Sequence, residues 1–130
     1  MGWFKKKIPA AQQEVAAPIA KIVAPTIQFV GEQDGSVERD LKSHFVELFR
    51  HESMVKSAYL ARAQHSDRTG VHVTLAIRHS GGEDPNLIPK LATIFSSMFS
   101  SHEHLDMMFL REDQEQQLRA VCAPFYQATG

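Results

Sequence analysis

The chain of 130 residues has a single cysteine, Cys122, no long apolar segment and almost no net charge. One cysteine excludes an internal disulfide framework and a cysteine-based zinc finger, and it fits a reducing compartment. The longest apolar runs fall far short of the roughly 18 residues that a membrane span requires. A net charge of −1 argues against a strongly basic domain that binds nucleic acid. We therefore expect a cytoplasmic protein without a nucleic-acid partner.

The composition is that of an ordinary globular protein, with 43% hydrophobic and 22% charged residues, and the length favours one domain. The charge is unevenly distributed. Residues 1–25 contain four lysines and one glutamate, a net charge of +3, whereas the whole chain carries −1. We predict a flexible basic N-terminal arm over residues 1–25 and a single α+β domain over residues 26–130.

The arm is interrupted by Pro9, Pro18 and Pro25, which prevent a long continuous helix. Trp3 and Phe4 stand beside three lysines, a combination that can contact an anionic membrane surface. A linker without such a contact is the favoured interpretation, and peripheral membrane contact through the arm is the alternative.

Hydrophobic periodicity predicts the elements of the domain. A β-type run at 26–31 precedes an amphipathic helix that begins at Ser36. Strands at 55–63 and 71–78 flank a polar, turn-rich segment and so form a β-hairpin. A second helix follows Asn86, a strand covers 105–110, and a last helix opens at Glu112. The predicted fold class is α+β: a small mixed β-sheet, made of a β-hairpin followed by a βαβ crossover, with three helices packed on it.

The strand at 71–78 alternates between two kinds of residue, so one of its faces is predicted to pack on the helices and the other to be open. The open face combines polar and apolar side chains, a composition that suits a contact surface. We take it as the candidate binding surface, with residues from the neighbouring strands added. The candidate residues are Arg62, His72, Thr74, Arg78, Asp106 and Met108.

No catalytic residue is predicted, because the chain has no nucleophile motif, phosphate-binding loop or HExxH sequence. Cys122 is interpreted as a packing residue on the inner side of the last helix. His102 and His104 could coordinate a metal if they lay on one face of a strand. The favoured interpretation is that both are solvated histidines in a loop. No metal or cofactor is predicted.

The body of the chain also contains short sequence segments that are typical of a known family. Residues 45–52, the segment 55–62 with Ala58-Tyr59-Leu60-Ala61, the alternating strand and the closing Pro124-Phe125-Tyr126 resemble the C-terminal domain of bacterial enhanced-serine-sensitivity (SseB-like) proteins. The resemblance covers roughly residues 36–127, and the family offers no catalytic residues to carry over.

Composition and resemblance together favour a non-catalytic interaction or regulatory module, with a protein partner or self-association. The alternative is a small-ligand or metal-binding domain that uses the histidine-rich edge. An enzyme is the third and least supported hypothesis, because no nucleophile–base arrangement is visible.

Overall fold

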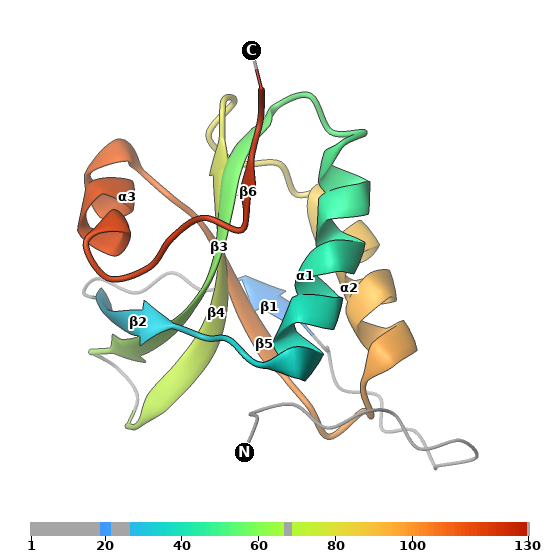
Figure 1. Ribbon diagram of the computed structural model, residues 1–130, viewed down its shortest axis with the longest axis horizontal. Helices are drawn as coiled ribbons and strands as arrows, with labels where there is room; N and C mark the ends of the chain where they lie inside the picture. The colour runs from blue at the N-terminus through green and yellow to red at the C-terminus, as the bar shows by residue number, and fades with distance from the viewer. Residues whose placement is uncertain (1–18, 22–26, 67–68, 130) are drawn as a thin grey trace.

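The computed structural model describes residues 19–21, 27–66 and 69–129, which form six strands and three helices (Figure 1). In chain order the elements are β1 (Ile19–Lys21), β2 (Ile27–Glu32), α1 (Ser36–Phe49), β3 (Val55–His65), β4 (Val71–His79), α2 (Leu87–Met98), β5 (Leu105–Phe109), α3 (Glu112–Arg119) and β6 (Tyr126–Gln127). The strands make one sheet in the order β1-β5-β4-β3-β2, and β6 also pairs with β3. The α+β fold class is confirmed.

The pairing of the strands follows the predicted scheme and extends it. β3 and β4 are the antiparallel hairpin, and β5 lies parallel to β4 after the α2 crossover. At one edge β1 pairs with β5 in parallel, although Ile19–Lys21 belong to the segment predicted as an arm. These three residues are therefore part of the sheet. The rest of the predicted arm, with Trp3 and Phe4, lies outside the described residues.

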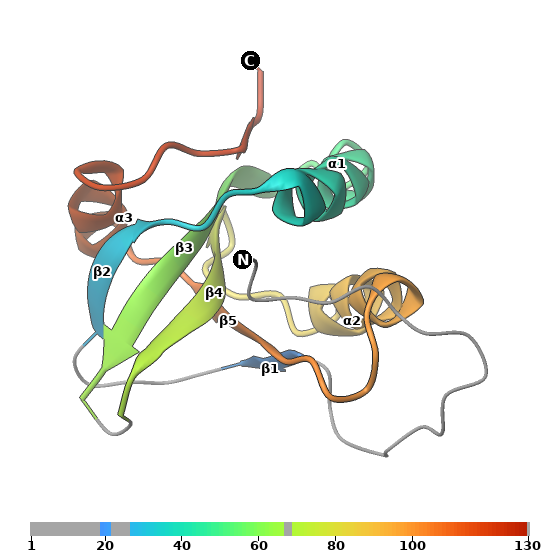
Figure 2. The same ribbon diagram turned by 60° about the horizontal axis from the view of Figure 1, so that its bottom comes forward.

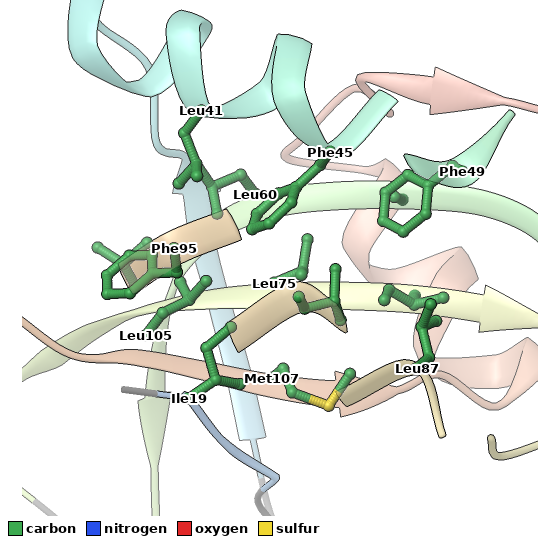
Figure 3. Close-up of a cluster of buried hydrophobic side chains, with 14 of the residues drawn as sticks. Ile19, Leu41, Phe45, Phe49, Leu60, Leu75, Leu87, Phe95, Leu105 and Met107 are labelled. Carbon is green, nitrogen blue, oxygen red and sulfur yellow. The ribbon is translucent and has the colours of Figure 1, made fainter. Parts of the chain in front are cut away.

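Helices α1 and α2 cover one face of the sheet (Figure 2). In α1 the apolar residues Leu41, Phe45 and Phe49 recur every four positions, so they form one stripe that faces the strands. Figure 3 shows this stripe above Leu60 and Leu75, which are fully buried. This face holds the larger of the two hydrophobic cores.

Helix α3 lies on the opposite face of the sheet, as both ribbon views show (Figures 1 and 2). Its Leu118, together with Cys122 just beyond it, packs on a second cluster that includes Phe29, Tyr59 and Met108. The sheet is thus covered by helices on both faces, which matters for the binding surface predicted from the sequence.

Periodicity predicts Val55 on the face of Tyr59 and Val121 inward with Cys122, and the structure differs at both positions. The pairing of β3 with β4 shifts register between Val55 and Ser57, and Val55 joins the core under α1 and α2 instead of the face of Tyr59. An extra residue in a strand reverses the alternation beyond it, which explains the reversal. Val121, unlike Cys122, is exposed.

Candidate functional site

The predicted binding surface is largely covered in the structure. Thr74 and Asp106 are partners across β4 and β5, and they are 0% and 1% exposed. Met108 is also buried, in the cluster beneath α3. The expectation of an open face is therefore wrong for these three residues. A helix on the second face of the sheet was missing from the sequence interpretation, and it accounts for the burial of Met108.

Arg62 lies on the other side of the sheet from the rest of the predicted set. It is paired with Val73 across β3 and β4, and residues directly opposite each other share a face. Val73 belongs to the core under α1 and α2. The Arg62 guanidinium covers Gly31, where an added Cβ would lie 2.8 Å from its Nη2 atom. Arg62 therefore cannot join Arg78 in one site.

Asp106 is the centre of a polar cluster that the sequence only partly indicated. Its Oδ1 atom lies 2.9 Å from His104 Nε2, and its Oδ2 atom lies 3.6 Å from His65 Nε2. His65 is fully buried and its ring contacts His72, a residue of the predicted surface whose Nε2 lies 3.0 Å from the Thr69 carbonyl oxygen. His65 was missed because the predicted strand ended at residue 63.

This cluster does not form a metal centre. Within residues 19–21, 27–66 and 69–129, no three histidine, cysteine, aspartate or glutamate side chains are arranged to hold a metal ion. Of the two histidines weighed as ligands, His104 contacts Asp106 and His102 is exposed.

A second polar network joins α3 to β3. The hydroxyls of Ser57 and Tyr59 both donate to Oε2 of Glu115, at 2.5 and 2.7 Å. Arg119 Nε donates to the Tyr59 hydroxyl oxygen at 2.7 Å. Burial, more than the Glu115 carboxylate, raises the pKa of Tyr59, against the opposing effect of Arg119. The network fixes α3 on the sheet through charge-assisted hydrogen bonds.

Burial by itself would raise the pKa of Glu115, but the hydroxyls of Ser57 and Tyr59 and the positive charges of Arg119 and Arg78 lower it overall. Arg78 lowers the pKa of Glu115 through its charge and without a hydrogen bond, because its Nε atom is 3.9 Å from Glu115 Oε1. Glu115 is thus a carboxylate whose Oε2 atom accepts hydrogen bonds from Ser57, Tyr59 and Arg119 within the domain.

The carboxyl ends of β4 and β5 create the most promising site. These neighbouring strands are parallel, so they end at the same edge of the sheet. The chain then leaves β4 for α2 on one face and leaves β5 for α3 on the other (Figure 2). Connections that diverge in this way open a crevice outside the strand ends, where α/β sheets commonly bind ligands.

A cavity of about 340 Å³ lies at this position. We call it the crevice. It is lined by residues from the two strand ends and the loops after them: Arg78, His79, Ser80, Gly82, Glu83, Phe109, Leu110 and Arg111. Of the residues predicted for the binding surface, only Arg78 lines it. Arg111 was missed, since nothing in the sequence places it in one cavity with Arg78.

Cys122 does not contribute a reactive group. Burial, with a smaller contribution from the Glu32 carboxylate, raises the pKa of its thiol to about 12. The thiolate is the nucleophilic form of cysteine, so at neutral pH this side chain stays protonated and unreactive. Its position in the cluster beneath α3 agrees with the packing role expected from the sequence.

The chain matches the model of one protein family, the SseB protein C-terminal domain, over residues 37–128. It therefore belongs to that family, and the resemblance seen in the sequence is confirmed. No curated protein and no solved structure matches the chain. Among the described residues, no helix has the length and apolarity to cross a membrane.

Proposed function

We propose that this domain is a non-catalytic interaction module of the cytoplasm and that it binds a protein partner through the crevice. The observation that supports this most is the position of the crevice, where the connections of two parallel strands diverge and where Arg78 and Arg111 come from different strand ends. A site lined by arginine and phenylalanine side chains suits protein contact, because these residue types are enriched at interfaces between proteins.

The polar groups elsewhere in the domain favour a structural role over a catalytic one. Glu115, Tyr59 and Arg119 bond to one another, and the Cys122 thiol stays protonated. A general base or nucleophile needs a free position next to its substrate. The hydrogen bonds of this network hold α3 instead, since Glu115 Oε2 accepts from Ser57, Tyr59 and Arg119.

The alternative function, a small ligand bound at the histidine-rich edge, rests on one contact. The His104 imidazole is 45% exposed and lies against the buried Asp106 carboxylate. Thermal stabilisation by a ligand that is lost in His104→Ala but kept in a crevice variant would support this alternative over the proposal.

The proposal is tested by blocking the crevice without changing its charge. Ser80 is exposed at the crevice, and Ser80→Trp places a large ring there. Ser96→Trp makes the same change on the exposed side of α2 and is the matched control. We expect immobilised wild-type protein and Ser96→Trp to retain a common partner from a bacterial lysate, and Ser80→Trp to retain about tenfold less.

Two results would contradict the proposal. Equal retention by Ser80→Trp and Ser96→Trp would place the interface elsewhere on the domain. A stable dimer in light scattering that Ser80→Trp leaves unchanged, together with no partner retained by the wild-type protein, would show self-association through another surface instead. Thermal melting of both variants checks that each is folded.

A further inference from the structure

Among the residues that the structure describes, none forms a hydrogen bond with the guanidinium group of Arg78. Its side chain is 30% exposed and lines the crevice, and its contact with Glu115 is an ion pair of 3.9 Å, beyond hydrogen-bonding distance. The Glu115 carboxylate is held instead by Ser57, Tyr59 and Arg119. A guanidinium has five donors. Those of Arg78 are therefore available to an acceptor in the crevice.

The Arg111 guanidinium is paired with a carboxylate. Its Nε and Nη2 atoms donate to the two carboxylate oxygens of Asp113, at 3.1 and 3.2 Å. This is the two-pronged geometry that pairs arginine with planar carboxylates. Both side chains of the pair are more than half exposed, and exposed ion pairs contribute little to stability. A carboxylate arriving in the crevice can therefore replace Asp113 at small cost.

The charged groups around the crevice favour a monoanion over a dianion. Its lining contains two arginines and Glu83, and the carboxylates of Asp113 and Glu115 lie against the arginines. The three carboxylates repel a dianionic phosphate more strongly than a singly charged carboxylate. Phe109 and Leu110 provide an apolar wall beside the arginines. The lining thus favours a carboxylate that adjoins an apolar group.

We propose, on the basis of the function proposed above, that the crevice binds a carboxylate of a protein partner between Arg78 and Arg111. The carboxylate adjoins an apolar residue of the partner, which packs against Phe109. The chemistry is the same for a chain-terminal carboxylate and for an acidic side chain, so the probes must distinguish them.

Amide chemical shifts report binding of small probes to the intact chain. N-acetyl-leucine carries a terminal carboxylate, and N-acetyl-glutamyl-leucinamide carries a side-chain carboxylate. N-acetyl-leucinamide lacks both, and inorganic phosphate tests anions in general. We expect saturable shifts of the Gly82 and Leu110 amides with one or both carboxylate probes, and none with the uncharged amide. Phosphate that binds as tightly as the carboxylates, or carboxylate shifts away from the crevice, would overturn the proposal.

Arginine variants test the clamp itself. Arg78→Gln and Arg111→Gln should each weaken carboxylate binding about tenfold, and Arg78→Lys should weaken it less than Arg78→Gln because it keeps the charge. Arg50→Gln, just after α1, removes an exposed arginine away from the crevice and should change nothing. Because Arg111 is 70% exposed, its variant leaves packing intact even if Arg78→Gln alters folding. Unchanged affinity in Arg111→Gln would refute the clamp.

Failure of this inference differs from failure of the proposed function. Loss of the partner in Ser80→Trp with full retention in both arginine-to-glutamine variants would leave the crevice as the interface but exclude a clamped carboxylate. Full retention in Ser80→Trp would reject the crevice as the partner site, whatever the small probes bind.

Discussion

Replacing Glu115 by glutamine measures how strongly α3 is held on the sheet. The substitution keeps the shape of the side chain and removes its charge. Both Ser57 and Tyr59 donate hydrogen bonds to this carboxylate. A hydrogen bond to a charged group contributes about 1.5–3 kcal/mol, and a neutral one about 0.5–1.5 kcal/mol. Each bond should therefore lose about 1 kcal/mol, which predicts a decrease of about 2 kcal/mol in the free energy of unfolding at pH 7.

The loss of stability in Glu115→Gln must become smaller at low pH. The pKa of Glu115 is lower in the folded protein, because hydrogen bonds from hydroxyls and nearby arginines outweigh the effect of burial. A lowered folded-state pKa gives stability that is complete above the unfolded pKa and is lost as the pH falls through the folded pKa. The difference between wild type and Glu115→Gln should therefore shrink as the pH falls below about 4.3, the ordinary glutamate value.

Urea denaturation at pH 7 and at successively lower pH tests this prediction. With a slope of about 2 kcal/mol per molar urea, a loss of 2 kcal/mol lowers the midpoint by about 1 M. Glu112→Gln, an exposed glutamate at the start of α3, controls for the general loss of a negative charge. Equal midpoints for Glu115→Gln and Glu112→Gln at pH 7, or a Glu115→Gln deficit that persists at low pH, would refute the reasoning.

Three further predictions concern buried residues. Thr74→Arg should lower stability by about 3 kcal/mol or more, because it places a charge at a fully buried position; a melting temperature like that of wild type would contradict the burial. Ile19→Ala should cost about 2–5 kcal/mol in urea denaturation, since Ile19 packs in the core beneath α1 and α2, and a change below 1 kcal/mol would show that β1 adds little. Cys122, with a thiol pKa of about 12, should react with a maleimide far more slowly in the native protein at pH 7 than in urea, and equal rates would disprove its protection.

The elements with strong local periodicity could be predicted from the sequence. The stripe of Leu41, Phe45 and Phe49 determines both the existence of α1 and the face it buries. The alternation of residues 71–78 likewise determines β4, and Leu75 and Ile77 do lie in the core that it predicted. In both cases the element is determined by residues that are close together in the sequence, so no contact with a distant segment is needed to predict it.

The missed features all depend on distant segments. β1 and β6 have three and two residues, too few to show a period, and each exists because a longer strand offers it backbone partners. The register shift near Val55 is a property of the pairing between β3 and β4. For the same reason the sequence indicated Arg78 but not Arg111, since the crevice exists only where the two strand ends meet.

The position of α3 explains both the failure of the predicted surface and the presence of the crevice. An amphipathic helix with one buried stripe can pack on either face of a sheet, so the sequence of α3 left its side undetermined. Because α3 packs opposite α1 and α2, it covers Met108 and closes that part of the face predicted to be open. The same choice makes the chain diverge after β4 and β5, which opens the crevice beside Arg78. Had α3 packed beside α2, the two connections would have left on one face, and Arg78 would lie on an uncovered sheet without a crevice.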